Sequence, residues 1–451
     1  MNQKLNQILR NVTVEPAVLF YFTTYMIMDA VNTNLFIQKI CRENITMEPS
    51  DLNTPCKNTT LASDFVSKMN SKYRAIMMLI CIIYSMFATC WSDEAGKRRR
   101  PLIFVPMIAQ FFHCLVGCLH SHFWLWHPKN AALTELIVES LGGGIPLMTV
   151  AVQMYICDVS NSENRTMRLG FLYAVELLCF PLGKGSAGFI IRAFGYFYSY
   201  LLCAVLSATG FLLAVIFVKD VSVPVVSNRS YIWRVVNLAG VRDSFGVIFK
   251  KSMGSRRMVV AVLILIKILM YFITQGEKTV FYLFMVEKFK WNEVDFSVFS
   301  FYKYSGVILG TVFCSILMSK ILKIHDGLIG AFAVFWDTIT AIGFLFATQN
   351  WHIYAVALFD VLHGTALSVC ISFISKHYDS TEFGRLSTVQ NAFAIFIPLC
   401  HPVYNGVFQM TIKSFPSAFF IISIILNILV FLLYSSSYLI SKKIENRIGK
   451  S

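Results

Sequence analysis

The sequence predicts an all-α polytopic membrane protein, and composition and patterning both point to it. Of the 451 residues, 56% are hydrophobic and only 14% are charged, whereas a soluble domain carries about 25% charged residues. The apolar residues come in blocks of roughly 18–25, the length that a helix needs to cross a ~30 Å hydrocarbon core. Lipid offers no partner for backbone amides, so such blocks form helices or a closed barrel. The alternating segments of a barrel are absent.

Twelve such blocks follow one another along the chain. Segment 219–257 separates the sixth from the seventh and carries eight basic residues between Lys219 and Arg257. We therefore expect a six-helix half at 1–218, a basic cytoplasmic linker at 219–257, a second six-helix half at 258–440 and a tail at 441–451. The predicted spans are 14–37, 73–91, 101–121, 131–157, 167–191, 196–218, 258–283, 297–319, 326–347, 351–375, 386–410 and 416–440.

The basic charge of the chain indicates its orientation in the membrane. Lys and Arg number 39 against 25 acidic residues, a net charge of +14. The basic residues concentrate in the connections on the side that holds both termini, which the positive-inside rule makes the cytoplasmic side. The excess is explained by topology, with some attraction to anionic lipid, so we expect no nucleic-acid partner.

The first external loop, 38–72, carries signs of an oxidising, glycosylating lumen. Asn44 and Asn58 both stand in acceptor sequons. Cys41 and Cys56 lie in the same loop, whereas most of the other cysteines lie within predicted spans, where a small apolar thiol needs no special role. We predict glycosylation at both asparagines and a Cys41–Cys56 disulfide.

The connection between the second and third spans holds the most specific local motif. It reads WSDEAGKRRRP and keeps Asp93, Gly96 and the basic run, which includes Arg98 and Arg99, of the signature G-x-x-x-D-x-x-G-R-R, with Thr89 where the first glycine belongs. This signature is typical of the major facilitator fold, with two pseudo-symmetric six-helix halves. Gly96 allows a tight turn, and Asp93 can hold a helix N-terminus or an arginine, as a gating latch would. The alternative is a basic cluster that only orients the protein.

A closer resemblance rests on two runs, WSDEAGKRRRPLIF and CDVSNSENRTMRLGFLYAVELL. They resemble the proton-coupled folate transporter family, solute carrier family 46, and the similarity extends loosely over the rest of the chain. It implies a twelve-span carrier of organic solutes, coupled to protons in the folate member, with relatives that handle muropeptides and steroid or drug conjugates. It also implies a gate salt bridge or helix cap at Asp158 and Arg168. Tyr271 departs from the folate member, which puts folate as the substrate in doubt.

Ionisable residues inside the predicted spans are candidates for function, because burying them in lipid is costly. Glu176 lies near the middle of the fifth span and corresponds to the glutamate that the resembled family uses for proton coupling; the alternative is a structural hydrogen bond. Asp360 and His363 are three residues apart, hence on one helix face, and could relay protons or form a satisfied pair between helices.

We expect the remaining polar residues of the spans to line a substrate cavity suited to an anionic solute. Lys267 could instead extend to the cytoplasmic interface. The cavity candidates are Asp29, Asn32, Lys267, Tyr271, Lys278, Lys303 and Asp337.

Together these observations predict a secondary active transporter that moves an organic anion by alternating access, coupled to protons through Glu176. The alternatives are a uniporter or a carrier without proton coupling, and a receptor or sensor that keeps the fold but has no flux. No nucleophile elbow, phosphate loop or metal-ligand spacing occurs, so we expect no enzyme, no metal and no cofactor. The expected partners are a small organic solute, protons and lipid, around a monomer. No acidic dileucine signal occurs in either tail, which favours the plasma membrane over the lysosome.

Overall fold

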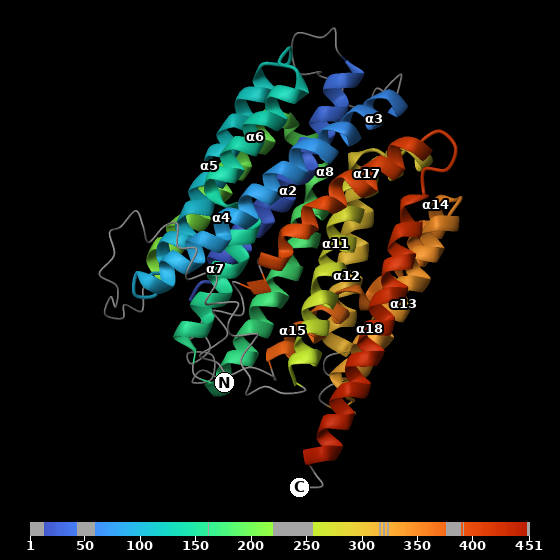
Figure 1. Ribbon diagram of the computed structural model, residues 1–451. Coiled ribbons are helices and arrows are strands. Elements are labelled where there is room, and N and C mark those ends of the chain that lie inside the picture. Colours follow the sequence, from blue (N-terminus) through green and yellow to red (C-terminus); the bar gives the residue numbers. More distant parts are fainter. Residues whose placement is uncertain are drawn as a thin grey trace, which may run out of the picture. The chain divides into compact units, whose positions relative to one another are not determined.

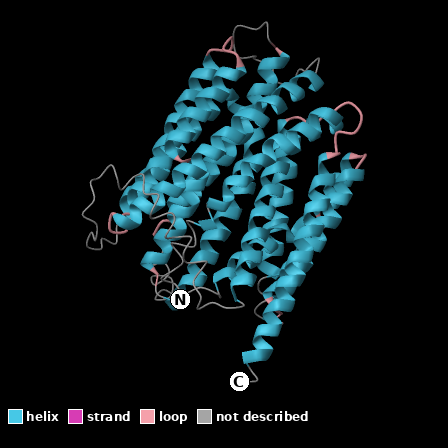
Figure 2. Cartoon of the chain, viewed as in Figure 1, coloured by secondary structure: helices cyan, strands magenta, loops and turns pink. Residues whose placement is uncertain are grey.

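The computed structural model describes residues 13–42, 59–160, 162–219, 256–314, 317–318, 321–322, 324–375, 389–390 and 392–448. Every regular element in these ranges is a helix (Figure 2). The predicted all-α class is therefore confirmed. Asn44, Cys56 and Asn58 lie outside the described residues, as does nearly all of the predicted linker.

The chain forms two compact units. Unit 1 comprises residues 1–55 and 77–241, and unit 2 comprises residues 56–76 and 242–451. The predicted boundary between the two halves falls within 219–257, of which the structure describes only the two ends. The exact division of the chain therefore stays a prediction.

Unit 1 is built from long helices that run beside one another (Figure 1). They are α2 (Glu15–Cys41), α4 (Ala75–Glu94, from residue 77 on), α5 (Arg100–His122), α6 (Pro128–Gly142), α7 (Gly144–Val159) and α8 (Ser162–Phe217).

Helix α8 contains two of the predicted spans. Its 56 residues would extend ~84 Å as one straight helix, far more than a bilayer requires. The helix breaks at Gly195, whose φ of 74° and ψ of −178° are not helical. Glycine adopts this backbone without steric cost, so α8 bends between the predicted spans 167–191 and 196–218.

Apolar side chains join the helices of unit 1. One buried cluster includes Val18 of α2, Met107 of α5, Met148 of α7 and Ala214 of α8. A second cluster holds Ile27, Cys114 and Tyr200. Helix α2 contributes to both clusters and packs along α8, so polar side chains of α2 are brought to the centre of this unit.

Unit 2 is also a set of helices packed around apolar side chains. They are α3 (Thr59–Met69), η1 (Asn70–Arg74), α11 (Arg256–Phe289), α12 (Glu293–Cys314), α13 (Asp326–Phe346), α14 (Asn350–Ala357), η4 (Asp360–Leu362), α15 (His363–Ser375), η5 (Ala394–Leu399), α17 (Cys400–Thr411) and α18 (Phe419–Ile448). Its main core joins Leu263 of α11, Val334 of α13, Cys370 of α15 and Tyr434 of α18.

Where the structure describes them, the predicted spans lie on helices. In the described ranges, eight helical stretches are long and apolar enough to cross a membrane, or nine if the bent pair of α14 with Asp360–Ile371 counts as one span. One of the eight, Phe171–Phe217, covers two predicted spans. The predicted spans 14–37 and 386–410 correspond, where the structure describes them, to α2 and to η5 with α17, which are not among these eight.

Candidate functional site

The predicted latch forms around one buried arginine in unit 1. Arg99 Nη2 lies 2.6 Å from Asp93 Oδ1, and Arg99 Nε donates to Asp158 Oδ2 at 2.8 Å. A third donor of the guanidinium reaches the Ser92 hydroxyl at 2.9 Å. Because one planar group binds two carboxylates from different helices, it links the end of α4 to the end of α7.

Backbone geometry explains how the motif presents this arginine. Gly96 has a φ of 81° and Lys97 a φ of 60°, so the chain turns sharply through the left-handed region. Glycine accepts that conformation readily, which accounts for its place in the motif. The turn leaves Arg98 exposed and directs Arg99 inward.

The electrostatics of the latch favour a permanently charged arginine. Burial alone would lower the pKa of Arg99, but the carboxylates of Asp93 and Asp158 outweigh burial and raise it above its ordinary value. Asp158 also lies 3.2 Å from Lys97 Nζ. Asp158 thus pairs with Arg99 and Lys97. Arg168 pairs with a different carboxylate, Glu15 of α2, at 3.4 Å.

Two of the predicted cavity residues of unit 1 lie on α2, one turn apart. Asp29 Oδ2 is 3.0 Å from Lys184 Nζ of α8, in a largely buried ion pair. Asn32 is buried, at 4% exposure, and its amide faces α5 and α8 rather than open space. Glu176 is half-buried on α8, eight residues before Lys184.

Among the described residues, a dense group of charges lies in unit 2. We name it the C-unit cluster, and it consists of Lys303, Asp337, Asp360 and His363. Lys303 Nζ is 2.8 Å from Asp360 Oδ2. His363 Nδ1 is 3.3 Å from Asp337 Oδ1 and 3.7 Å from Asp360 Oδ1. The residues come from α12, α13, η4 and α15, so four elements meet at this point.

Aromatic rings complete the surroundings of the lysine. The Lys303 ammonium lies 4.9 Å from the ring centroid of Phe281 and 5.3 Å from that of Phe344. Such contacts stabilise a cation that has left water. Lys303 is therefore held by a carboxylate and by ring faces, and it is already neutralised before any anionic solute arrives.

Charge balance shows what the C-unit cluster can do. Asp337 and Asp360 are buried and His363 is half-buried, and Glu277 of α11 interacts electrostatically with Lys303, Asp360 and His363. Within the four residues of the cluster, two carboxylates against one lysine leave one excess negative charge when the imidazole is neutral, and none when it carries a proton. Buried charge without a partner is costly, so a proton on the imidazole would balance the charges of the cluster.

The same carboxylates could in geometry ligate a metal ion. Ligand atoms of Asp337, Asp360 and His363 lie within 4.8 Å of one another. The Lys303 ammonium, however, already occupies one oxygen of Asp360 at 2.8 Å. Since that cation would repel a divalent metal at the same carboxylate, the donor set does not fit a metal site.

Three predicted cavity residues share one face of α11. Lys267, Tyr271 and Lys278 are separated by four and seven residues, which returns a helix to nearly the same direction. All three are half-buried. The Lys267 ammonium donates to Gln390. Two ammonium groups thus flank a phenol along a strip of about 16 Å.

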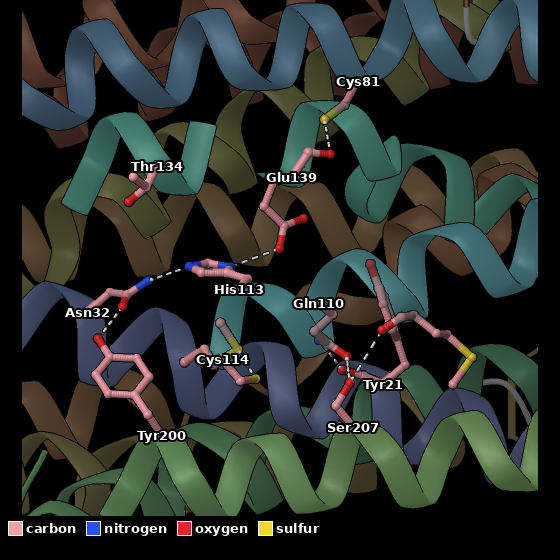
Figure 3. Close-up of polar contacts among 12 residues, drawn as sticks. Tyr21, Asn32, Cys81, Gln110, His113, Cys114, Thr134, Glu139, Tyr200 and Ser207 are labelled. Carbon is pink, nitrogen blue, oxygen red and sulfur yellow. Dashed lines mark hydrogen bonds and ion pairs between the residues drawn. The ribbon is translucent and has the colours of Figure 1, made fainter. Parts of the chain in front are cut away.

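Some polar residues of the interior were not predicted from sequence. His113 of α5 and Glu139 of α6 form a buried pair in unit 1, with 2.9 Å between Nδ1 and Oε1 (Figure 3). Glu15, the partner of Arg168, was missed as well. His113 and Glu139 both stand inside predicted spans, so the rule that intramembrane ionisable residues are functional candidates would have found them.

The predicted external-loop features are only partly within the described residues. Cys41, at the end of α2, is disulfide-bonded. Its predicted partner Cys56 and the predicted glycosylation sites Asn44 and Asn58 lie outside the described residues. The pairing and both modifications stay predictions.

Comparison with known proteins identifies the family of the fold. Residues 75–400 match the sequence profile of the Major Facilitator Superfamily. The chain is also similar in fold to the human organic anion transporter MFSD10 (TM-score 0.65, 13% identity, 93% of this chain and 97% of the other). A peptide transporter POT solved with sulfate is similar too (TM-score 0.64, 11% identity, 95% and 94%).

Relatives in sequence are similar over nearly the whole chain. The lysosomal proton-coupled steroid conjugate and bile acid symporter SLC46A3 of Rattus norvegicus is 24% identical, covering 91% of this chain and 90% of the relative. The human protein of the same name is 23% identical over the same shares. A probable peptidoglycan muropeptide transporter SLC46 of Drosophila melanogaster is 21% identical, over 91% and 82%. The predicted resemblance to solute carrier family 46 is confirmed.

Proposed function

Because this chain belongs to the Major Facilitator Superfamily, we propose that it is a secondary active transporter that carries an amphipathic organic anion together with protons. The observation that carries this proposal is the C-unit cluster, whose carboxylates outnumber its cations until His363 is protonated. A group that reaches better charge balance by binding a proton gives the carrier a site that responds to a proton gradient.

The proposed substrate class follows from the polar face of α11. Lys267 and Lys278 supply two positive charges, and Tyr271 supplies a ring between them that an apolar framework can contact. A bulky solute with an acidic group fits such a strip. The relatives named for steroid conjugates, bile acids and muropeptides, and the fold neighbour named for organic anions, agree with this class.

Proton coupling is proposed at two places in the chain. Glu176 in α8 is the predicted coupling residue of unit 1 and is half-buried. Asp360 and His363 belong to the C-unit cluster in unit 2. Acidification favours the protonated form of each group, so a lower pH on the side from which substrate enters should stimulate transport.

The latch is proposed to hold one of the two access states. Arg99 binds both Asp93 and Asp158, and Arg168 binds Glu15 on another helix. Ion pairs of this kind can be exchanged in a two-state transition. Arg98 is exposed, so we assign the gating function of the basic run to Arg99.

The compartment in which the protein resides is proposed from the proton-binding groups and from the names of the similar symporters. The lack of an acidic dileucine signal favours the plasma membrane, but the similar symporters are named as lysosomal. We propose an acidic-compartment membrane with both termini cytoplasmic, because an acidic lumen supplies the protons that the clusters take up. Fluorescence microscopy of the tagged protein beside a lysosomal marker tests this; a signal confined to the cell surface would contradict it.

Uptake into proteoliposomes tests the function itself. Sulfated steroid, bile acid, muropeptide and folate are offered at pH 5.5 and 7.4 outside, with the lumen at pH 7.4. We expect at least one of the first three to enter faster at pH 5.5, and a protonophore to abolish the difference. Equal rates at both pH values would indicate a uniporter. Binding without entry would indicate a sensor.

A further inference from the structure

A buried polar network in unit 1 joins four helices (Figure 3). The Tyr200 hydroxyl of α8 donates to Asn32 Oδ1 of α2, and Asn32 Nδ2 faces His113 Nε2 of α5 at 3.5 Å. His113 Nδ1 lies 2.9 Å from Glu139 Oε1 of α6. All four residues are buried, with at most 5% of their surface exposed. The network forms one continuous path from a tyrosine to a carboxylate.

The hydrogen bonds of this path define the protonation state of His113. Asn32 Oδ1 accepts from Tyr200, so the amide nitrogen of Asn32 faces the imidazole. An amide nitrogen only donates, and His113 Nε2 therefore accepts and carries no proton. The single proton of the ring is then on Nδ1, from which it is donated to the Glu139 carboxylate. In this arrangement the Asn32 amide donates to one ring nitrogen of His113, and the other ring nitrogen donates to Glu139.

Adding a proton to this path requires a rearrangement. A proton on Nε2 would turn that atom into a donor facing the amino group of Asn32, and two donors repel each other. Rotation of the Asn32 amide by half a turn relieves this, because Oδ1 then accepts from the imidazole. The same rotation turns the amide nitrogen towards Tyr200, so the present bond from Tyr200 is replaced by one in which the Asn32 amide donates to the Tyr200 oxygen.

The groups around His113 and Glu139 supply no cation to the Glu139 carboxylate other than a protonated His113 itself, as far as the contacts of the described residues show. Cys81 of α4 donates its thiol to the Glu139 carbonyl. Lys39 of α2 is held by the carbonyl oxygens of His120, Phe123 and Trp126, 2.7–3.2 Å away. The other titratable groups in electrostatic contact with the path are Tyr21 of α2, Cys114, Cys118 and His120 of α5, Glu135 of α6, and Cys203 of α8.

The path from Tyr200 to Glu139 lies beside a residue that is predicted to line the substrate cavity. Asn32 lies one turn after Asp29 on α2, and Asp29 is paired at 3.0 Å with Lys184 of α8. The amide hydrogen bond and the ion pair therefore link the same two helices, α2 and α8. A change at Asn32 therefore acts on the same two helices that the ion pair of Asp29 with Lys184 joins.

We propose that His113 and Glu139 form a second proton-binding site of the carrier, and that the Asn32 amide transmits its protonation state to α2 and α8. This inference rests on the proposed function of proton-coupled transport and adds to it a site in unit 1 that is separate from Glu176. Each cycle then moves one proton on and off His113 Nε2, while Glu139 keeps the charged ring in place.

Nitrogen-15 NMR of histidine-labelled full-length protein in lipid tests proton binding directly. The signal of His113 is identified by its loss in His113→Gln, among nine histidines. We expect the neutral Nδ1–H form at pH 8 and the doubly protonated ring at pH 5, within the range in which histidine ordinarily titrates. A ring that keeps one form over this whole range would overturn the proposal, and this readout does not depend on finding a substrate.

Transport measurements test whether the site acts in the cycle. In His113→Gln we expect the ratio of uptake at pH 5.5 to uptake at pH 7.4 to fall by about threefold or more, since a group titrating near neutrality has been removed. Tyr200→Phe should keep the NMR titration but also lower the ratio, because transmission through Asn32 is lost. His122→Gln, on the exposed end of the same helix, is the matched control.

The two tests separate failure of this inference from failure of the proposed function. Titration of His113 in a protein whose wild type shows no pH-stimulated uptake would contradict proton-coupled transport but leave the binding site intact. Normal pH stimulation in folded His113→Gln, with exchange at wild-type rate, would contradict the second site and leave proton coupling standing.

Discussion

The two units hold their buried charges in different ways. In unit 1, His113 and Glu139 form a pair of one imidazole and one carboxylate, bounded by neutral hydrogen-bonding groups. In unit 2, the C-unit cluster adds a permanent cation, Lys303, and a second carboxylate to the same imidazole–carboxylate contact. In unit 2 the permanent charge of Lys303 pairs with Asp360. In each unit a histidine faces a carboxylate, and a proton on the imidazole would balance the charge of that carboxylate.

The largest effect should follow from removing the permanent cation. Lys303→Met leaves Asp360 buried beside Asp337 without its ammonium, and breaking a buried pair in this way costs about 3–5 kcal/mol. We expect a marked fall in the thermal unfolding midpoint of the purified protein in detergent. The double variant Lys303→Met with Asp360→Leu should recover most of that loss, because no unpaired charge remains. Equal stability of Lys303→Met and wild type would contradict the pairing.

The latch should show the next largest effect. Arg99→Lys keeps the charge but cannot bind Asp93 and Asp158 together, and it should cost about 1–3 kcal/mol together with an altered balance of access states. Cysteine accessibility on the two sides of the membrane measures that balance. The matched control is Arg98→Lys, on an exposed side chain, which should stay within about 0.5 kcal/mol of wild type.

A smaller change in stability but a clear change in pH response is expected for the cluster histidine. His363→Gln removes the group that a proton charges while leaving Lys303 with Asp360. Acid stimulation of uptake should fall because the group that holds a proton between Asp337 and Asp360 is gone. Initial rates from pH 5 to 8 measure this, and an unchanged profile would remove His363 from the coupling scheme.

The most selective effect is expected at Glu176. Glu176→Gln should abolish uptake driven by a pH gradient and spare exchange of labelled for unlabelled substrate, because exchange needs no net proton movement. Comparing the two assays in one preparation provides the control for folding. Loss of both activities together would indicate a structural function for this carboxylate instead.

Sequence patterns predicted the all-α class, the twelve helical spans and the facilitator family, because lipid forces long apolar helices whatever the details. They also placed Asp360 and His363 on one face, since a spacing of three is local. The pairing of Asp29 with Lys184 could not be predicted in the same way, because only tertiary packing brings α2 to α8. The pairing of His113 with Glu139 could not be predicted either: the rule for intramembrane ionisable residues would single out each of them, but only packing shows that they face each other.

Two residues predicted to line the substrate cavity have partners within the protein instead. Lys303, predicted to line a cavity for an anion, is already paired with Asp360, and Asn32 is part of a buried network. Lys267, Tyr271 and Lys278 share one face of α11. The partners of intramembrane charges are set by helix packing rather than by local sequence.

Steady-state accumulation against an imposed pH gradient tests proton-coupled transport most directly. Proteoliposomes holding the wild-type chain are incubated with the transported anion until its internal concentration is constant, at several gradients. We predict that the ratio of internal to external substrate exceeds one and rises with the gradient, with a smaller rise in His113→Gln and in His363→Gln. A ratio that stays at one for every gradient, with entry still catalysed, would contradict the account.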